Sequence, residues 1–353
     1  MSSRFYDIDP SLENCWRGVI LFGRNVASYK FALAKSLLEL ADKKSDFIAL
    51  EELAEPFSRH IVEHVKNGYK QATSSSSRFL KACEQFSQGN LTHDKLIGTT
   101  TQLGFANVIE AFHNVNNAEI PHRFFTDERD GTRKGIRLTD NLFKLHELET
   151  AESLTPEVEA RWRLVETSWE LNISRRLISV KHDIEAEQFF VSDENRRIDV
   201  TSSRDSLNGY QKGKCFYCSQ FISVVSGSLF LAHVDHFFPH TLKQYGVSAI
   251  PHILKPYGVS ANLDGVWNLV LACAYCNGAA EKGAKVPSIR LLERLNTRNE
   301  YLIGSNHPLK QTLIRQTGKD ATTRAAFLQG VYTKAKAFLL HTWEPLVNAD
   351  PTF

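Results

Sequence analysis

The chain has 353 residues, of which 42% are hydrophobic and 23% are charged. This balance is ordinary for a globular protein and argues against a disordered chain or a coiled coil, and the length allows two domains or one large one. No apolar run approaches the roughly 18 residues that suggest a membrane span, so we expect a soluble, cytoplasmic protein without a signal peptide or a membrane partner.

The net charge of +2 is unevenly distributed along the sequence. Residues 201–320 contain thirteen Lys and Arg against seven Asp and Glu, and the same segment contains four of the six cysteines. A basic surface there would suit a polyanionic partner, because phosphate contacts supply most of the non-specific affinity for nucleic acids. Charge alone does not decide this, since many solvated surfaces carry a similar local excess.

The first two hundred residues carry mainly helical patterns. One apolar stripe at three- and four-residue spacing runs through 22–40 and another through 50–65. A third helix is expected to begin at Thr155, which can act as its N-cap, with Pro156 in the first turn and one apolar face through 158–173.

A β-hairpin is predicted after these first helices. Residues 123–125 and 136–138 flank the turn-rich stretch 127–135, and a helix is expected just before them, at about 103–115. Helices followed by a hairpin could form a winged-helix-like DNA reader, but a helical scaffold with a hairpin at its edge fits the same residues. Residues 183–211 are expected to connect this domain to the next.

Residues 239–250 are repeated in residues 251–262, with nine of the twelve positions identical. Two copies are too few for a solenoid, and lengthening a surface loop costs little closure entropy. The simplest interpretation of this tandem duplication is a tolerated insertion.

Two Cys-x-x-Cys pairs, Cys215 with Cys218 and Cys273 with Cys276, indicate a metal site in a reducing cytosol rather than disulfide cross-links. Four thiolates in a tetrahedral array select zinc, and an ion with no open position is structural. An iron–sulfur cluster, a redox-active pair and buried free thiols are the alternatives, and the doubled spacing argues against the last two.

Between the cysteine pairs, residues 233–240 contain three histidines and Asp235. On an extended segment, the side chains of Asp235 and His236 diverge, so we expect a carboxylate that holds a hard cation and an imidazole that takes a proton from water. Asn277 directly follows the last cysteine, where a zinc knuckle would fix its backbone, and its amide oxygen can join Asp235 on one ion. Asn268 is expected to order a loop by bonding nearby backbone.

The motifs occur in the order Cys215-x-x-Cys218, Asp235-His236-x-x-Pro239, Asn268-Leu269 and Cys273-x-x-Cys276-Asn277. This order resembles the four-cysteine, zinc-containing branch of the HNH nucleases, also called the ββα-metal fold, and the resemblance is confined to residues 210–300. It implies that 228–238 and 266–272 form two strands and that a helix begins after Asn277. It also implies that His236 is the general base, that Asp235 and Asn277 bind one Mg²⁺ or Mn²⁺ ion, and that Asn268 orders the loop carrying the histidine.

The sequence departs from the family pattern in two places. The family often has a lysine three residues after the last asparagine, whereas here the first lysine is Lys282, so phosphate contact by Lys282 or Lys285 is an open expectation. The duplication also lengthens the path from the histidine to Asn268, and either His240 or His252 could lie beside the site.

Beyond the module, Arg290, Arg294 and Arg298 recur at four-residue spacing on a predicted helix. Such a row suits contact with a DNA backbone and is equally typical of an ordinary exposed face. The segment 325–343 is expected to be a closing helix.

Together these patterns predict an α+β protein with a mainly helical N-terminal domain (1–185), used for substrate recognition or as a scaffold, a zinc-stapled ββα-metal (HNH) nuclease domain (186–320) and a C-terminal helix (321–353). The expected activity is metal-dependent hydrolysis of phosphodiester bonds in double-stranded DNA. The resemblance extends this to a role in restriction or phage defence, with a homodimer or defence-system partner proteins. The alternatives are a non-catalytic zinc-dependent nucleic-acid-binding module and a scaffold protein with an inactivated nuclease domain.

Overall fold

The computed structural model describes residues 5–7, 9–23, 27–43, 45–72, 77–115, 118–170, 180–183, 188–193, 196–245, 263–305 and 308–346. The chain divides into two compact units. Pro10–Ile173 form one, called here the N-terminal unit, and Met1–Asp9 with Ser174–Phe353 form the other, the C-terminal unit.

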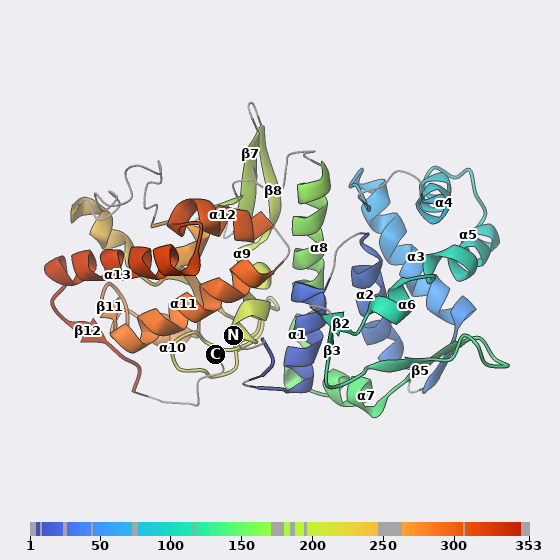
Figure 1. The fold of residues 1–353 in the computed structure, drawn as a ribbon, viewed down its shortest axis with the longest axis horizontal. Coiled ribbons are helices and arrows are strands. Elements are labelled where there is room, and N and C mark those ends of the chain that lie inside the picture. Colours follow the sequence, from blue (N-terminus) through green and yellow to red (C-terminus); the bar gives the residue numbers. More distant parts are fainter. Residues whose placement is uncertain are drawn as a thin grey trace. The chain divides into compact units, whose positions relative to one another are not determined.

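The N-terminal unit is mainly helical, as its sequence predicts (Figure 1). Its helices are α1 (Leu12–Phe22), α2 (Tyr29–Ala41), α3 (Leu50–Lys66), α4 (Arg78–Ser87), α5 (His93–Thr99), the π-helical turn η1 (Thr100–Gly104), α6 (Val108–Ala111), α7 (Asp140–His146), η2 (Glu149–Ser153) and α8 (Leu154–Glu170). The prediction that the apolar stripe through 22–40 belongs to one helix is wrong, because α1 ends at Phe22 and α2 begins at Tyr29. Thr155 does not cap α8, since it lies inside the helix.

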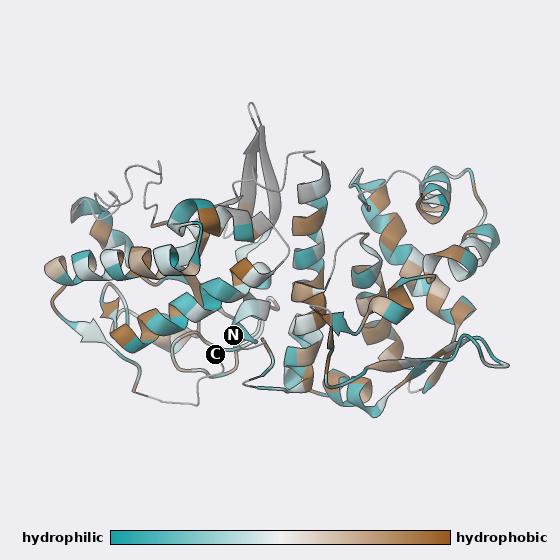
Figure 2. Ribbon diagram, in the orientation of Figure 1, coloured by the Kyte–Doolittle hydropathy of each residue, from teal (hydrophilic) through white to brown (hydrophobic). Residues whose placement is uncertain are grey.

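Cys15 and Cys83 are buried on α1 and α4, as small apolar residues are expected to be. Alternating hydrophilic and hydrophobic residues along the helices mark their solvent and core faces (Figure 2). Among the residues that the structure describes, no helix is long and apolar enough to cross a membrane.

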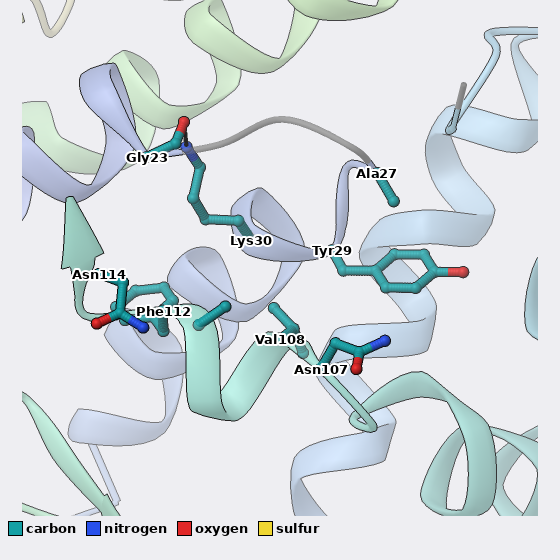
Figure 3. A pocket seen from close by; sticks show the side chains of 9 residues that line it. Gly23, Ala27, Tyr29, Lys30, Asn107, Val108, Phe112 and Asn114 are labelled. Atoms are coloured by element: carbon teal, nitrogen blue, oxygen red, sulfur yellow. Dashed lines mark hydrogen bonds between the residues drawn. The ribbon is translucent and has the colours of Figure 1, made fainter. Parts of the chain in front are cut away.

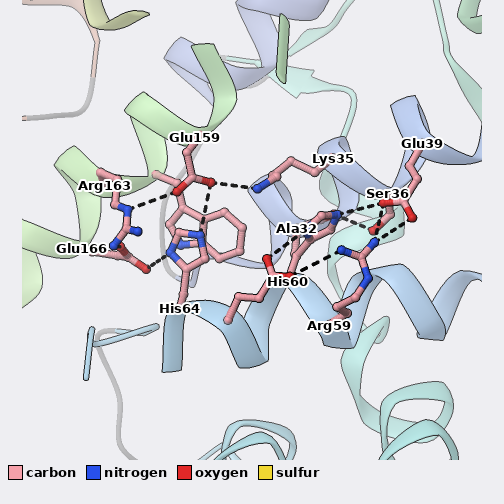
Figure 4. Close-up of polar contacts among 12 residues, drawn as sticks. Ala32, Lys35, Ser36, Glu39, Arg59, His60, His64, Glu159, Arg163 and Glu166 are labelled. Atoms are coloured by element: carbon pink, nitrogen blue, oxygen red, sulfur yellow. Dashed lines mark hydrogen bonds and ion pairs between the residues drawn. The ribbon is translucent and has the colours of Figure 1, made fainter. Parts of the chain in front are cut away.

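A buried polar network joins α3 to α8 at the centre of this unit (Figure 4). The His64 imidazole stacks on Trp162 with ring centroids 3.6 Å apart, and its Nδ1 lies 2.6 Å from a carboxylate oxygen of Glu166. Burial lowers the pKa of His64, but hydrogen bonds to Glu159 and Glu166 outweigh this and raise it overall. A charged imidazole between carboxylates is stabilised in this way, so these residues support the fold of the unit.

A pocket of about 300 Å³ lies beside α2 and α6 and has Tyr29, Val108 and Phe112 in its lining (Figure 3). The amine of Lys30 also lines it and donates to the backbone oxygens of Ile20, at 3.2 Å, and Gly23, at 2.9 Å. Those oxygens lie at the end of α1, where helix carbonyls need partners. Lys30 therefore provides a hydrogen-bond donor for the carbonyl oxygens at the C-terminal end of α1.

The predicted hairpin is present as β4 (Phe125–Asp127) and β5 (Gly135–Leu138), which pair antiparallel. A third strand, β1 (Phe47–Ala49), pairs with β5 and was not predicted. Gly135 permits this pairing, because a Cβ there would clash with the Ile48 carbonyl oxygen. The predicted helix at 103–115 is wrong in extent: α6 covers only Val108–Ala111, and β2 (Asn114–Val115) pairs with β3 (Ala118–Glu119) after it.

His113 makes this region sensitive to acid. Its Nε2 accepts a hydrogen bond from the Phe124 amide at 3.0 Å, and burial lowers its pKa to about 4. In the unfolded chain a histidine has a pKa near 6.5, so the unfolded state binds the extra proton between these values and stability falls as pH falls from about 6.5 to 4.

Replacing His113 with Gln is expected to reduce this acid-induced loss of stability by about 3 kcal/mol. The measurement is the free energy of unfolding of wild type and variant at pH 7 and pH 4. An identical loss in wild type and His113→Gln would contradict the assignment.

The C-terminal unit begins with an antiparallel sheet of β6 (Val180–Asp183), β7 (Gln188–Asp193) and β8 (Arg196–Ser202). The prediction that 183–211 is a connection is therefore wrong. Asp193, the last residue of β7, lies opposite Arg196, the first residue of β8, and charged residues at strand ends resemble a linker when only composition is considered. The sheet is followed by α9 (Ser203–Asn208) and the 3₁₀ turn η3 (Gly209–Gln211).

The central hairpin of this unit pairs β9 (His233–His236) antiparallel with β10 (Leu269–Ala272), placing His236 opposite Leu269 and Asp235 opposite Val270. The predicted strands were longer: 228–232 form turns with an isolated bridge, and η6 (Val266–Asn268) is a 3₁₀ turn. All four residues of β10 are buried. β10 is therefore the strand of this hairpin that lies in the core of the unit.

The helix expected directly after Asn277 is absent from the described residues 278–288. The short helix α10 (Ala274–Asn277) ends there, turns follow, and the next helix begins at Ile289. Gly283 has a φ of +44°, and a Cβ there would lie 2.8 Å from the Ala279 carbonyl oxygen. The glycine thus allows a tight reversal in place of a helix.

Three helices, α11 (Ile289–Gly304), α12 (Pro308–Thr317) and α13 (Ala321–Phe338), pack against one another and complete the unit (Figure 1). The closing helix was predicted to reach residue 343, but Thr342–Trp343 form β12, which pairs in parallel with β11 (Val286–Pro287). Trp267 is fully buried between these helices and the hairpin, with its ring 4.9 Å from that of Phe327.

Candidate metal centres and active site

The sulfur atoms of Cys215, Cys218, Cys273 and Cys276 all lie within 4.8 Å of one another. Those of Cys218 and Cys273 are 3.8 Å apart. A zinc ion about 2.3 Å from each of four sulfurs would set them about 3.8 Å apart, so the donor set fits a tetrahedral zinc ion. This tetracysteine group could hold a zinc ion, as the sequence predicted.

Backbone bonds build both cysteine knuckles. In the first, the Cys215 amide donates to the Gln220 oxygen at 2.7 Å, and Ser219 turns the chain with a φ of 62°. In the second, Cys273 caps α10 and its sulfur accepts from the Cys276 amide at 3.5 Å. Hydrogen bonds among the four thiols lower the pKa of Cys218 to about 7 and lower that of Cys273, and they raise the pKa of Cys215 and of Cys276. A bound zinc ion would displace the remaining thiol protons.

Arg294 lies against the first knuckle. Its guanidinium donates to the Tyr217 carbonyl oxygen at 3.3 Å and to the Ser219 hydroxyl at 2.6 Å, and it is buried. Burial lowers its pKa to about 10, which still leaves it charged at neutral pH. A cation there offsets the negative charge of four thiolates around one zinc ion.

The expectation of an exposed arginine row on α11 is therefore wrong for two of its three members. Arg294 and Arg298 are buried, and Arg298 donates to the Trp267 carbonyl oxygen at 3.4 Å. Arg290 is exposed, but it pairs with Glu344 at 3.3 Å. Four-residue spacing places the three on one helix face, and that face packs against the domain at two of the three positions.

Asp235 and His236 have separate partners, as their alternation on β9 requires. The Asp235 carboxylate accepts from the Tyr217 hydroxyl at 2.6 Å and from the Lys282 amine at 2.9 Å. Lys282 is buried, with its side chain only 1% exposed, and also donates to the His236 carbonyl oxygen. The Lys282 amine lies 2.9 Å from both oxygens of Asp235, so an ion bound by this carboxylate would compete with the amine.

The imidazole of His236 lies in a different cluster. Its Nε2 is 2.8 Å from Nε2 of His240, and both face the same oxygen of Asp264, at 3.6 Å from His236 and 3.0 Å from His240. Lys243 donates to both oxygens of Asp264 at 2.8 Å. His240 thus lies beside the site, whereas its duplicate His252 is outside the described residues.

Asn268 is fully buried and holds the chain that follows His236. Its amide oxygen accepts from the Phe238 N–H at 2.8 Å, and its amide nitrogen donates to the Phe238 oxygen at 3.0 Å and to the Leu263 oxygen at 2.7 Å. One side chain therefore satisfies both backbone groups of Phe238 and links them to the residue before Asp264.

The remaining predicted site residues lie near the second knuckle. Asn277 is half-buried at the end of α10, and its sharing of an ion with Asp235 stays a prediction. Lys285 is exposed and donates to the backbone oxygens of Ala280, at 2.8 Å, and Glu281, at 2.6 Å. Lys282 is occupied within the site rather than presented to a nucleic acid.

Sequence reasoning missed three side chains of the site. Tyr217 lies inside the first knuckle, where its position between two cysteines could have suggested a neighbour of Asp235. Asp264 lies two residues beyond the end of the duplication, and nothing in the local pattern ties it to His236. Lys282 was considered only as a phosphate contact. No family model, curated protein or solved structure matches the chain.

Proposed function

We propose that the C-terminal unit is a metal-dependent nuclease of the HNH type that hydrolyses phosphodiester bonds in DNA. The observation that carries the proposal is the Asn268 amide, which holds the chain after His236 through three hydrogen bonds. This loop-ordering role is the one that the family resemblance assigns to that asparagine. The four-cysteine group and the Asp235-His236 strand support the same proposal.

In this proposal, His236 accepts a proton from water through Nε2 as the water oxygen attacks the phosphorus. The bond from phosphorus to the leaving sugar oxygen then breaks. Asp235 and Asn277 would hold a Mg²⁺ or Mn²⁺ ion, which supplies charge neutralisation at the phosphate. The Lys282 amine, 2.9 Å from Asp235, holds that carboxylate in place.

The deciding experiment is cleavage of supercoiled plasmid by the full chain with and without added Mg²⁺ or Mn²⁺. His236→Ala is expected to reduce the rate by about 10²–10⁴-fold. His233→Ala is the matched control, because His233 is exposed on the same strand, and it should cleave as wild type does.

A His236→Ala protein that cleaves as fast as wild type would overturn the role of the histidine. A folded, zinc-containing wild-type protein that binds DNA and cleaves no plasmid would overturn the nuclease. That result would favour the non-catalytic zinc-dependent nucleic-acid-binding module.

A further inference from the structure

A second cluster of metal-ligand atoms lies beside β9, apart from the four sulfurs. It consists of His236 Nε2, His240 Nε2 and one carboxylate oxygen of Asp264. The three atoms form a triangle with sides of 2.8, 3.0 and 3.6 Å. They come from β9, the 3₁₀ turn η4 (His240–Tyr245) and the segment before η6.

We propose that His236, His240 and Asp264 form a second metal site, which takes a transition ion such as Zn²⁺. An ion about 2.0–2.1 Å from each ligand would separate the ligand atoms by about 3.3 Å in a tetrahedral site and about 3.0 Å in an octahedral one. The three observed distances lie on either side of these values. Small side-chain movements would therefore complete either geometry.

The chemistry of the donors points to the same class of ion. Imidazole nitrogen suits Zn²⁺, Fe²⁺, Ni²⁺ and Cu²⁺, whereas Mg²⁺ prefers oxygen ligands alone. Two histidines and one carboxylate leave at least one coordination position open for water. This distinguishes the second site from the four-thiolate group, in which every position is filled by protein.

The charge around the cluster sets how tightly an ion is held. Lys243 donates to both Asp264 oxygens at 2.8 Å and thus competes with an ion for that carboxylate. Its side chain is 38% exposed, so solvent screens part of the repulsion and the amine has room to move away. We therefore expect exchangeable binding rather than a permanently filled site.

The tandem duplication conserves this ligand set. His240 is the second residue of the first copy, and Asp264 lies two residues beyond the end of the second copy. His252 has the same place in its copy as His240, so deletion of either twelve-residue copy leaves a histidine four residues after His236. The insertion lengthens the chain between ligands without changing them.

Ion binding here goes beyond the proposed nuclease, since it uses neither Asp235 nor Asn277. One consequence does rest on the proposed function. An ion bound to Nε2 of His236 takes the lone pair that would accept the proton from water. Added Zn²⁺ should then inhibit cleavage, because the ion and the proton from water would compete for Nε2 of His236.

The test is Co²⁺ binding by the full chain, with the metal content measured by mass spectrometry and the ligand type by absorption spectroscopy. Wild type is expected to bind one Co²⁺ ion with sulfur-to-metal charge-transfer bands and a second one without them, with the ion that Asp235 and Asn277 would hold subtracted by means of an Asp235→Ala variant. His240→Ala and Asp264→Asn should each lose only the second ion, and His233→Ala should keep both. The retained charge-transfer bands show that the unit is folded.

Lys243→Met should have the opposite effect on binding of the second ion. It should tighten binding of the second ion by about 2–5-fold, because the competing cation is gone. A single Co²⁺ ion per wild-type chain, with sulfur bands only, overturns the second site. So does a total Co²⁺ content that is the same in wild type, His240→Ala and Asp264→Asn.

The two proposals fail separately in these experiments. Mg²⁺-dependent plasmid cleavage by a chain whose Co²⁺ content does not change in His240→Ala and Asp264→Asn would reject the second site and keep the nuclease. A Co²⁺ ion that both variants lose, in a chain that cleaves nothing, would keep the site and reject the nuclease.

Discussion

Replacing Cys276 with Ser is expected to abolish zinc binding and to lower the Tm of the C-terminal unit by about 10–20 °C. Cys276 is fully buried, and its sulfur completes the four-sulfur group. Zinc binding in small peptides stabilises the fold by about 10–16 kcal/mol, and a unit with its own apolar core depends on only part of this. A loss of about 5 kcal/mol would already produce the expected shift.

The measurement combines metal content with thermal unfolding followed by circular dichroism. Cys83→Ser is the matched control, because Cys83 is also buried but lies on α4 in the N-terminal unit. That variant should keep its zinc, and any change in Tm should belong to the other unit. A Cys276→Ser protein with wild-type zinc content and Tm would show that the cysteines do not form a structural site.

The parts of the site that could be predicted from sequence are those fixed by short-range geometry. A Cys-x-x-Cys spacing brings two sulfurs to one point whatever surrounds it, and two such pairs need only one strand pairing to meet. Alternation along β9 separates Asp235 from His236, and their partners do differ. Asn268 also bonds nearby backbone, as an asparagine in a loop commonly does.

The remaining parts depend on tertiary packing that no local pattern encodes. The sequence offers Lys282 as a phosphate contact, yet the turn after Asn277 returns it to Asp235, where its side chain is buried. Arg294 has the spacing of an exposed row, but its guanidinium packs against the knuckle. A buried charge is stable only beside its partner, and sequence does not show which partner the fold supplies.

The same reasoning applies to Asp264, which meets His236 and His240 from the far side of the duplication. The repeat hides this contact in the sequence, because a tolerated insertion gives no indication that the residues on its two sides meet in the fold. In the fold, the Asn268 amide bonds Leu263, the residue immediately before Asp264. The asparagine thus holds both segments that supply ligands to the second cluster.

Replacing Asn268 with Ala is therefore expected to affect stability and site geometry together. The change removes three hydrogen bonds, of about 1 kcal/mol each, and leaves the Phe238 and Leu263 backbone groups without the amide that satisfies them. A loss of about 2–4 kcal/mol should lower the Tm of the unit by about 5–15 °C. Because the released chain follows His236, plasmid cleavage should fall at least about tenfold at a temperature where the variant is still folded.

Ser305→Ala separates the two effects, because Ser305 is also buried and its hydroxyl donates to the Leu302 carbonyl oxygen at 2.7 Å, at the C-terminal end of α11. It should lower the Tm but keep wild-type cleavage and both Co²⁺ ions, whereas Asn268→Ala should weaken binding of the second ion as well. Equal cleavage and equal ion binding by the two variants would mean that Asn268 stabilises the unit without positioning its histidines. The Asn268 side chain bonds the backbone of Phe238 and Leu263 and touches neither imidazole. A loss of cleavage and of second-ion binding in Asn268→Ala alone would therefore mean that the order of the loop positions both the base and the second metal site.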